Sequence, residues 1–197
     1  MPGDRWLIAG LGNPDPGYAG NRHNPGFLTA DVLAARAGAR FRAGKFRALS
    51  AEGRVAGLSV IIAKPLTFMN DSGVAVAGIS RYHQIPPQRL VVVHDELDPP
   101  FGAIRLKCGG GDSGHNGLRS VTAHLGTREY NRVRIGIGRP LGRMDPAAYV
   151  LRDFSPAERK ELPFLLDRAA DAVEALLADG LAAAQNVFHT ADTSGTC

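Results

Sequence analysis

Two side chains that could perform acid–base chemistry follow apolar runs typical of buried strands. His23 lies in the Gly- and Pro-rich loop that follows the run LIAGLG, and Asp95 directly follows the β-branched run LVVVH. A carboxylate at a buried strand end needs a partner because its desolvation is costly. If it accepts a hydrogen bond from one imidazole nitrogen, it fixes the tautomer, and the other nitrogen can take a proton from water. The pair therefore predicts a water-activating site, with a structural histidine and a turn-capping aspartate as the alternatives.

Amide, aromatic and thioether side chains occupy comparable loops. Asn13 and Tyr18 lie in the first of these loops, and the segment LTFMN after a later strand contains Phe68, Met69 and Asn70. The Asn70 amide has both a donor and an acceptor, so it could hold a peptide amide or orient a water molecule. Phe68 and Met69 at such a position are more often part of a hydrophobic core than of a ligand surface.

The glycine-rich segment CGGGDSGHNG delivers two further polar side chains to the start of a predicted helix. Asn116 is interpreted either as the N-cap of that helix or as a polar group of the site, and the local sequence favours the cap. His115 precedes it. His94 adjoins Asp95, and strand alternation directs it to the opposite side. Ligands bind open α/β sheets outside the carboxyl ends of the strands, where we expect these groups to gather.

Several familiar sites are excluded by the local pattern. GLGNPD fails as a dinucleotide fingerprint, because Asp15 stands at the third glycine position and Pro14 interrupts the motif. GGGDSGHNG lacks the Gly-Lys-Ser/Thr ending of a P-loop, and no G-x-S-x-G serine elbow occurs. His23, Asp95 and His115 could in principle bind a metal, but they lack a compact ligand spacing. We therefore expect neither a metal nor a cofactor.

The predicted elements alternate between strands and helices. Strands are expected at residues 5–10, 46–52, 54–63, 90–94, 103–107 and 132–137, and helices at 26–37, 72–83, 118–125 and from Ser155 onward. Ser155, Pro156 and Glu158 resemble an N-cap with proline at the first helical position and a capping box. The alternation predicts an α/β fold with a largely parallel sheet, and a turn at Gly53 predicts one antiparallel pair. One domain is expected over residues 1–189, with a flexible tail at 190–197.

Composition and charge are those of an ordinary globular domain. The chain has 197 residues, 44% hydrophobic and 21% charged, and a formal net charge of +4, which suits a polyanionic partner or simply a basic solvated surface. Cys108 and Cys197 show neither metal-ligand spacing nor a disulfide framework, which favours a reducing compartment. The sequence shows no apolar segment of bilayer length and no signal-peptide pattern, so the cytoplasm is the expected location and no membrane association is expected.

Together, the motif-bearing segments closely resemble the bacterial-type peptidyl-tRNA hydrolase family. The matching stretches are GLGNPDPGYAGNRHNPGF, KPLTFMNDSGVAV, VVVHDELDPPFGAIRLKCGGGDSGHNGLRS and RVRIGIGRP, with a looser match at AAYVLRDF, all within residues 7–154. The resemblance implies a monomeric, metal-free cytosolic enzyme with one α/β domain, in which helices cover a twisted mixed sheet. Its substrate would be peptidyl-tRNA, whose ester between the peptide and the 3′ end of the tRNA it would hydrolyse.

The resemblance also implies roles for individual residues. His23 would be the general base that activates water, and Asp95 would orient and polarise it. Side-chain amides would hold the peptide main chain and the reacting ester: Asn13, Asn70 and Asn116. The cleft would be lined by Tyr18, Phe68, Met69 and His115. Phosphates of the tRNA would be contacted by Lys107 and Arg134, and residues 140–153 would overlie the cleft as a mobile lid.

Two positions depart from the family pattern. Asn21 stands where a threonine is usual, and Ser113 replaces a glycine, which affects the expected loop geometry but not the implied reaction. Two other readings stay open at this stage. One is a non-catalytic RNA-binding relative with the same fold, and the other is a metal-dependent hydrolase of small esters or peptides.

Overall fold

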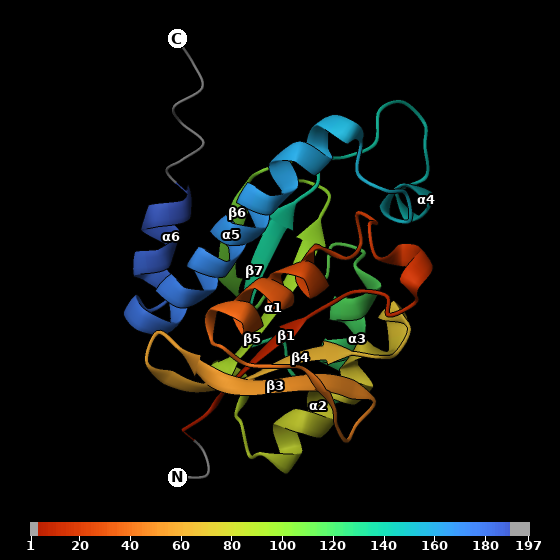
Figure 1. The fold of residues 1–197 in the computed structure, drawn as a ribbon. Coiled ribbons are helices and arrows are strands. Elements are labelled where there is room, and N and C mark those ends of the chain that lie inside the picture. Colours follow the sequence, from red (N-terminus) through yellow and green to blue (C-terminus); the bar gives the residue numbers. More distant parts are fainter. Residues whose placement is uncertain (1–3, 190–197) are drawn as a thin grey trace.

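In the computed structural model, which describes residues 4–189, one mixed sheet forms the centre of the molecule (Figure 1). Within those residues the sheet has seven strands, in the order β2-β3-β4-β1-β5-β7-β6. Its central strands are parallel: β4 (Leu58–Pro65), β1 (Trp6–Gly10), β5 (Leu90–Glu96) and β7 (Asn131–Gly136). Its outer strands pair antiparallel: β2 (Arg42–Ala43), β3 (Ala48–Val55) and β6 (Ile104–Cys108).

Helices cover both faces of the sheet. One face packs under α1 (Pro25–Arg36), α5 (Pro156–Asp179) and α6 (Leu181–His189). The other face packs under α2 (Ser72–Tyr82) and α3 (Asn116–Leu125). The side chains of Leu7–Ala9 in β1 and of Leu90–Val93 in β5 alternate between the two cores, so these parts of both strands are apolar, as the run LVVVH predicted. A short helix, α4 (Pro146–Val150), lies at the end of the sheet towards which the parallel strands point (Figure 1).

The predicted α/β class and mixed sheet are confirmed, and two details of the sheet differ from the sequence prediction. Gly53 lies inside the continuous strand β3, so the prediction of a turn there was wrong. The hairpin turn lies at Ala56 and Gly57, which both have positive φ, and it pairs Val55 with Leu58. The antiparallel pairing of β6 with β7 was not predicted from the sequence.

The start of α5 matches its predicted signals. The Ser155 hydroxyl accepts a hydrogen bond from the Glu158 amide, and the Glu158 carboxylate accepts one from the Ser155 amide. This reciprocal capping box, with Pro156 at the first helical position, confirms the prediction and fixes where the chain turns into α5. The predicted tail at 190–197 lies outside the described residues. Within residues 4–189, no helix combines the length and the apolar character needed to cross a membrane.

Candidate active site

A cavity of about 690 Å³ opens beyond the carboxyl ends of β1, β4 and β5. This is the edge of the sheet where the sequence placed the chemistry-bearing side chains. Eight of the predicted site residues line the cavity: Asn13, His23, Phe68, Met69, Asn70, Asp95, His115 and Asn116. They come from four separate loops or strand ends, which the fold brings together.

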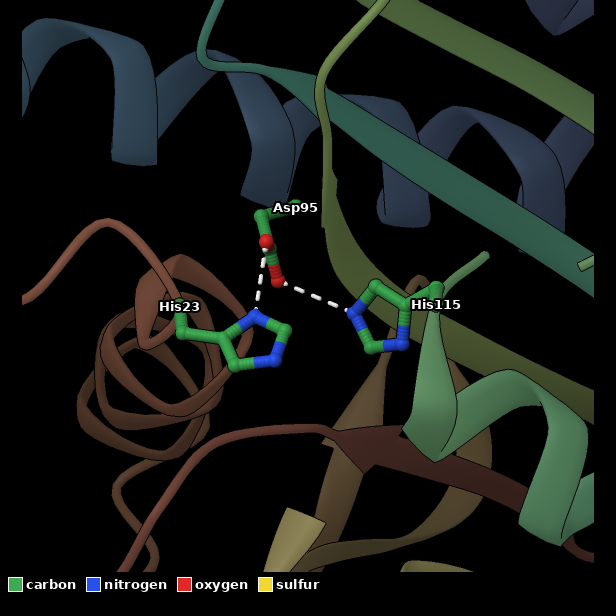
Figure 2. A group of neighbouring side chains, drawn as sticks. All are labelled: His23, Asp95 and His115. Atoms are coloured by element: carbon green, nitrogen blue, oxygen red, sulfur yellow. Dashed lines mark hydrogen bonds and ion pairs between the residues drawn. The ribbon is translucent and has the colours of Figure 1, made fainter. Parts of the chain in front are cut away.

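His23 and Asp95 form the central contact of the cavity (Figure 2). Nδ1 of His23 lies 2.8 Å from Oδ2 of Asp95, and the carboxylate is almost fully buried at the end of β5. An ionised carboxylate only accepts hydrogen bonds, so Nδ1 carries the proton. Nε2 of His23 is then the unprotonated nitrogen and the candidate base, on a ring that lines the cavity.

Asp95 also accepts a hydrogen bond from a second imidazole. Nε2 of His115 lies 3.0 Å from Oδ1 of Asp95, so the two histidines bind different oxygens of one carboxylate (Figure 2). The rings of His23 and His115 are 4.9 Å apart between centroids. His115 is also the N-cap residue of α3, because its Nδ1 accepts the Leu118 amide. The expectation that Asn116 is the cap was therefore wrong, and the Asn116 side chain instead lines the cavity.

The charges at the site shift the pKa values of both members of the pair. Burial opposes protonation of His23, but the charge of Asp95 and the hydrogen bond to it prevail and raise the pKa of His23 above its ordinary value. Burial alone would raise the pKa of Asp95, yet the interactions with His23 and His115 hold that pKa far below its usual range. The carboxylate is thus ionised at neutral pH and able to fix the orientation of both rings.

Asn13 links two loops of the cavity. Its side-chain oxygen accepts a hydrogen bond from the Met69 amide at 3.2 Å, which holds the loop after β4 against the loop after β1. Asn24 in turn brackets the Asn13 backbone, accepting from its amide at 2.8 Å and donating to its carbonyl at 3.1 Å. Asn24 is a buried positioning residue for which the sequence suggested no role. The only sign of this role in the sequence was that a polar residue stands next to His23 in a segment that packs against the core.

The cavity has a polar side and an apolar side. Asn70 and Asn116 are exposed at its polar rim, where their amides can reach a bound molecule. Phe68 is 73% exposed, which is unusual for a large aromatic side chain, whereas Met69 is buried. Phe68 therefore presents apolar surface to the cavity entrance and is not part of the hydrophobic core.

The expectation for Tyr18 was wrong, whereas His94 points to the predicted side and has a role that the sequence did not suggest. Tyr18 ends a short 3₁₀ helix, Pro16–Tyr18, and is not among the residues that line the cavity, contrary to the expectation. His94 lines it although strand alternation turns it towards α3. Its ring makes an edge contact with His115, at 5.0 Å between centroids, and burial holds its pKa well below the ordinary value. The uncharged ring of His94 thus packs against the ring of His115 and helps to hold it in place.

A short helix forms the roof of the cavity, defined as residues 145–151. Its lining residues are mainly apolar: Asp145, Pro146, Ala147, Val150 and Leu151. Asp145 caps α4 by accepting a hydrogen bond from the Ala147 amide. The roof falls within the segment expected to overlie the cleft, and the mobility of that segment stays a prediction.

Lys107 of β6 and Arg134 of β7 are not among the residues that line the cavity. Their neighbours Leu106 and Val133 face the core under α5, so Lys107 and Arg134 point to the opposite face of the sheet. Arg134 forms a 3.0 Å ion pair with Glu96, which itself lines the cavity. Burial and the nearby charges of Arg134 and Arg132 lower the pKa of Lys107, so these cations lie close together.

Arg132 organises the loop beside these cations. It is 1% exposed, and its guanidinium donates to the carbonyl oxygens of Gly110 and Gly111 at 2.9 and 2.6 Å. The glycine-rich segment is therefore held against β7 by a buried cation. Sequence reasoning missed this role, because a fully buried arginine in a strand is rare.

His23, Asp95 and His115 are also the described residues that could hold a metal ion. Their donor atoms lie within 4.8 Å of one another. In the observed arrangement, however, each imidazole already donates a hydrogen bond to the carboxylate. A metal would have to replace both N–H protons and the hydrogen bonds that they make. The donor set therefore fits a hydrogen-bonded acid–base centre better.

Comparison with known proteins places this geometry in a family. The family model described as peptidyl-tRNA hydrolase matches residues 7–195. The peptidyl-tRNA hydrolase of Frankia alni is 61% identical over 184 residues, covering 93% of each chain, and that of Pseudarthrobacter chlorophenolicus is 57% identical over 194 residues, covering 98% of this chain and 99% of the relative. The crystal structure of peptidyl-tRNA hydrolase from Acinetobacter baumannii matches with a TM-score of 0.86 at 38% identity, covering 93% of both chains. The chain belongs to the peptidyl-tRNA hydrolase family.

Proposed function

We propose that this protein hydrolyses the ester bond that joins a peptide to the 3′ end of tRNA, with water activated by His23. Family membership supports the reaction class, and the observation that carries the mechanism is the 2.8 Å contact between His23 Nδ1 and the buried Asp95 carboxylate. That contact fixes the tautomer in which Nε2 can accept a proton. We further propose that the enzyme acts as a monomer in the cytoplasm, because one chain supplies the whole site and its substrate arises from translation.

The proposed reaction has two steps. Water attacks the ester carbonyl carbon while His23 Nε2 takes its proton, and the imidazolium that forms is stabilised by Asp95. The tetrahedral intermediate then collapses, the bond to the ribose oxygen breaks, and His23 returns the proton to that oxygen. The products are a free peptide carboxyl group and a tRNA with a free 3′ end. An activated ester needs no covalent enzyme intermediate, so an oriented water and a positioned base suffice.

The amides of the polar side supply the remaining interactions in this proposal. Asn70 and Asn116 line the cavity and can donate hydrogen bonds to the developing oxyanion or hold the attacking water. Together with Asn13 they can pair with peptide N–H and C=O groups, which every peptide carries. Recognition through the peptide main chain explains how one site would accept many sequences.

The tRNA would be held by charge, without sequence readout. We propose that Lys107 and Arg134 contact its phosphates, because both lie on the sheet face that adjoins the cavity through Glu96. Phosphate contacts of this kind are independent of nucleotide sequence. The ester would then be presented to His23 from the side of the glycine-rich segment.

The deciding experiment is release of labelled peptide from a purified peptidyl-tRNA by the wild type and by His23→Ala, each with and without excess chelator. We expect the wild type to be active in both conditions, and His23→Ala to lose activity by about 10²–10⁴-fold while retaining substrate binding. Binding without release by the wild type would favour a non-catalytic RNA-binding protein. Activity that chelator abolishes would favour a metal-dependent hydrolase.

A further inference from the structure

The two residues that precede His23 are bound to the last residue of the roof and to the segment that follows it. Asn21 donates from its side-chain amide to the Leu151 carbonyl at 2.6 Å, and its backbone forms an antiparallel bridge with Asp153. The Arg22 amide donates to the Arg152 carbonyl at 3.0 Å. The loop that carries the candidate base His23 is thus also hydrogen-bonded to the chain at the end of α4.

The Arg22 side chain adds further contacts between the same two segments. It is buried, and its guanidinium donates to the Asp153 carbonyl and to the Glu158 carboxylate. It also stacks over Tyr149 of α4, 4.6 Å from the ring centroid. These contacts pair both terminal nitrogens of the guanidinium, while Nε has no hydrogen-bond partner among the described residues, and they tie the segment from Tyr149 to Glu158 to the loop that carries His23.

Apart from the contacts of Asn21 and Arg22, the roof is held by a hydrogen bond of 3.3 Å from the Tyr149 hydroxyl to the Ile137 carbonyl. α4 spans five residues, none of them buried, and a helix this short is not stable without tertiary contacts. Its apolar residues nevertheless line the catalytic cavity. Most of the described polar contacts that position the roof and the chain directly after it are therefore made by Asn21 and Arg22.

We propose that Asn21 and Arg22 form a clamp that holds the roof closed over the peptide part of the substrate. The inference rests on the proposed function, because it assigns the apolar roof to the peptide. Asn21 and Arg22 are positioning residues, which act on binding through α4 and do not touch the reacting ester. Loosening the clamp should weaken peptide binding and leave the chemical step intact.

Asn21→Asp tests the clamp most directly, because the variant keeps the side-chain shape and loses the N–H donor to Leu151. We expect KM for peptidyl-tRNA to rise about tenfold, with kcat changed by less than about twofold. Inhibition by uncharged tRNA should be unchanged, because the clamp lies away from Lys107. Amide hydrogen exchange over residues 146–152 should accelerate in the substrate-free variant.

A second variant and a control separate the clamp from general destabilisation. Arg22→Lys keeps the charge but lacks the fork that reaches both Asp153 and Glu158, so it should reproduce the same pattern if Asn21→Asp does not fold. Arg36→Met is the control, because Arg36 ties α1 to α5 through Asp167, Asp171 and Glu174 without touching the roof. It should leave KM and the exchange of the roof unchanged.

Three outcomes would overturn the clamp. The first is unchanged exchange over residues 146–152 in both variants, and the second is faster exchange with an unchanged KM. The third is a rise of KM in Arg36→Met as large as in Asn21→Asp. If the wild type released no peptide, the proposed function would fail, whereas hydrogen exchange would still decide whether Asn21 and Arg22 hold the roof.

Discussion

His115 Nε2 lies 3.0 Å from Oδ1 of Asp95, while His23 Nδ1 lies 2.8 Å from Oδ2 (Figure 2). The Leu118 amide donates to Nδ1 of His115, so the proton that His115 donates to Asp95 is on Nε2. Two imidazoles therefore share one carboxylate. Any change in the hydrogen bond from His115 alters the basicity of Asp95, and through Asp95 it alters the pKa of His23.

Asp95→Asn should lower kcat by roughly 10²–10⁴-fold, because an amide no longer fixes the tautomer of His23 or stabilises the imidazolium. The charge of Asp95 raises the pKa of His23 against the effect of burial, so its removal should lower that pKa. Only the unprotonated Nε2 can accept a proton, so the acid limb of kcat/KM should move to lower pH. A pH profile of the variant checks this, and an acid limb that stays in place would contradict the role of Asp95.

His115→Ser should move the acid limb in the opposite direction. Serine is a good N-cap, so α3 keeps its cap while Asp95 loses one hydrogen-bond donor. The carboxylate becomes more basic, so it stabilises protonated His23 more strongly and raises the pKa of His23. Activity should fall below pH 7 and recover at higher pH.

His115→Ala separates this effect from capping. Both variants should show the same shift of the acid limb, because both lose the hydrogen bond to Asp95. His115→Ala should in addition lose about 1 kcal/mol of unfolding free energy with the cap. If the acid limb shifted only in His115→Ala, the variant that also loses stability, the result would argue against a carboxylate shared by His23 and His115.

The order of elements was largely predictable because each strand carries its own periodic signal, and the pairing of β6 was not. The buried run LVVVH and the capping signals at Ser155 act within a few residues, where sequence patterns are informative. The direction in which β6 pairs with β7 depends on contacts distant in the chain. The prediction of a turn at Gly53 was wrong because glycine is needed there for close packing against α1 and the residues that follow it. An added Cβ at Gly53 would lie 3.1 Å from the Cβ of Ala37. The Ala56-Gly57 turn lacks the asparagine or aspartate typical of such turns.

Most residues of the site could be predicted from the sequence, whereas the contacts between them were less predictable. His23 and Asp95 follow strands that end at the same edge, which sequence order alone suggests. Which residue caps α3 was not predictable, because histidine is not a preferred cap and acts here through the position of its ring. The assignment of Tyr18 came from the family resemblance, and its 3₁₀ turn leaves it outside the cavity wall.

Gly26→Ala should destabilise the protein by about 1–3 kcal/mol, because the first turn of α1 touches the sheet there. An added Cβ would lie 2.3 Å from the Val93 carbonyl oxygen and 2.5 Å from that of Leu11. Urea unfolding measures the loss. Gly44→Ala is the matched control, because its nearest contact would be an ordinary 3.6 Å, and its stability should change by less than about 0.5 kcal/mol.

Lys107→Ala should weaken tRNA binding and reduce the slope of log Kd against log salt by about one, the effect of one lost phosphate contact. Arg134→Ala should reduce the slope by less, because the 3.0 Å ion pair with Glu96 already neutralises part of its charge. Uncharged tRNA titrated at several salt concentrations gives both slopes. Equal slopes for wild type and Lys107→Ala would place the tRNA elsewhere.

Glu96→Gln tests the ion pair itself. Without the carboxylate, Arg134 gains its full charge towards phosphate, so tRNA binding should tighten and the salt slope should steepen. Arg54→Ala removes an exposed cation from β3, near the opposite edge of the sheet, and should leave the slope unchanged. Since Glu96 also lines the cavity, tighter tRNA binding in Glu96→Gln together with an unchanged acid limb would show that phosphate binding and the acid–base centre can be altered separately.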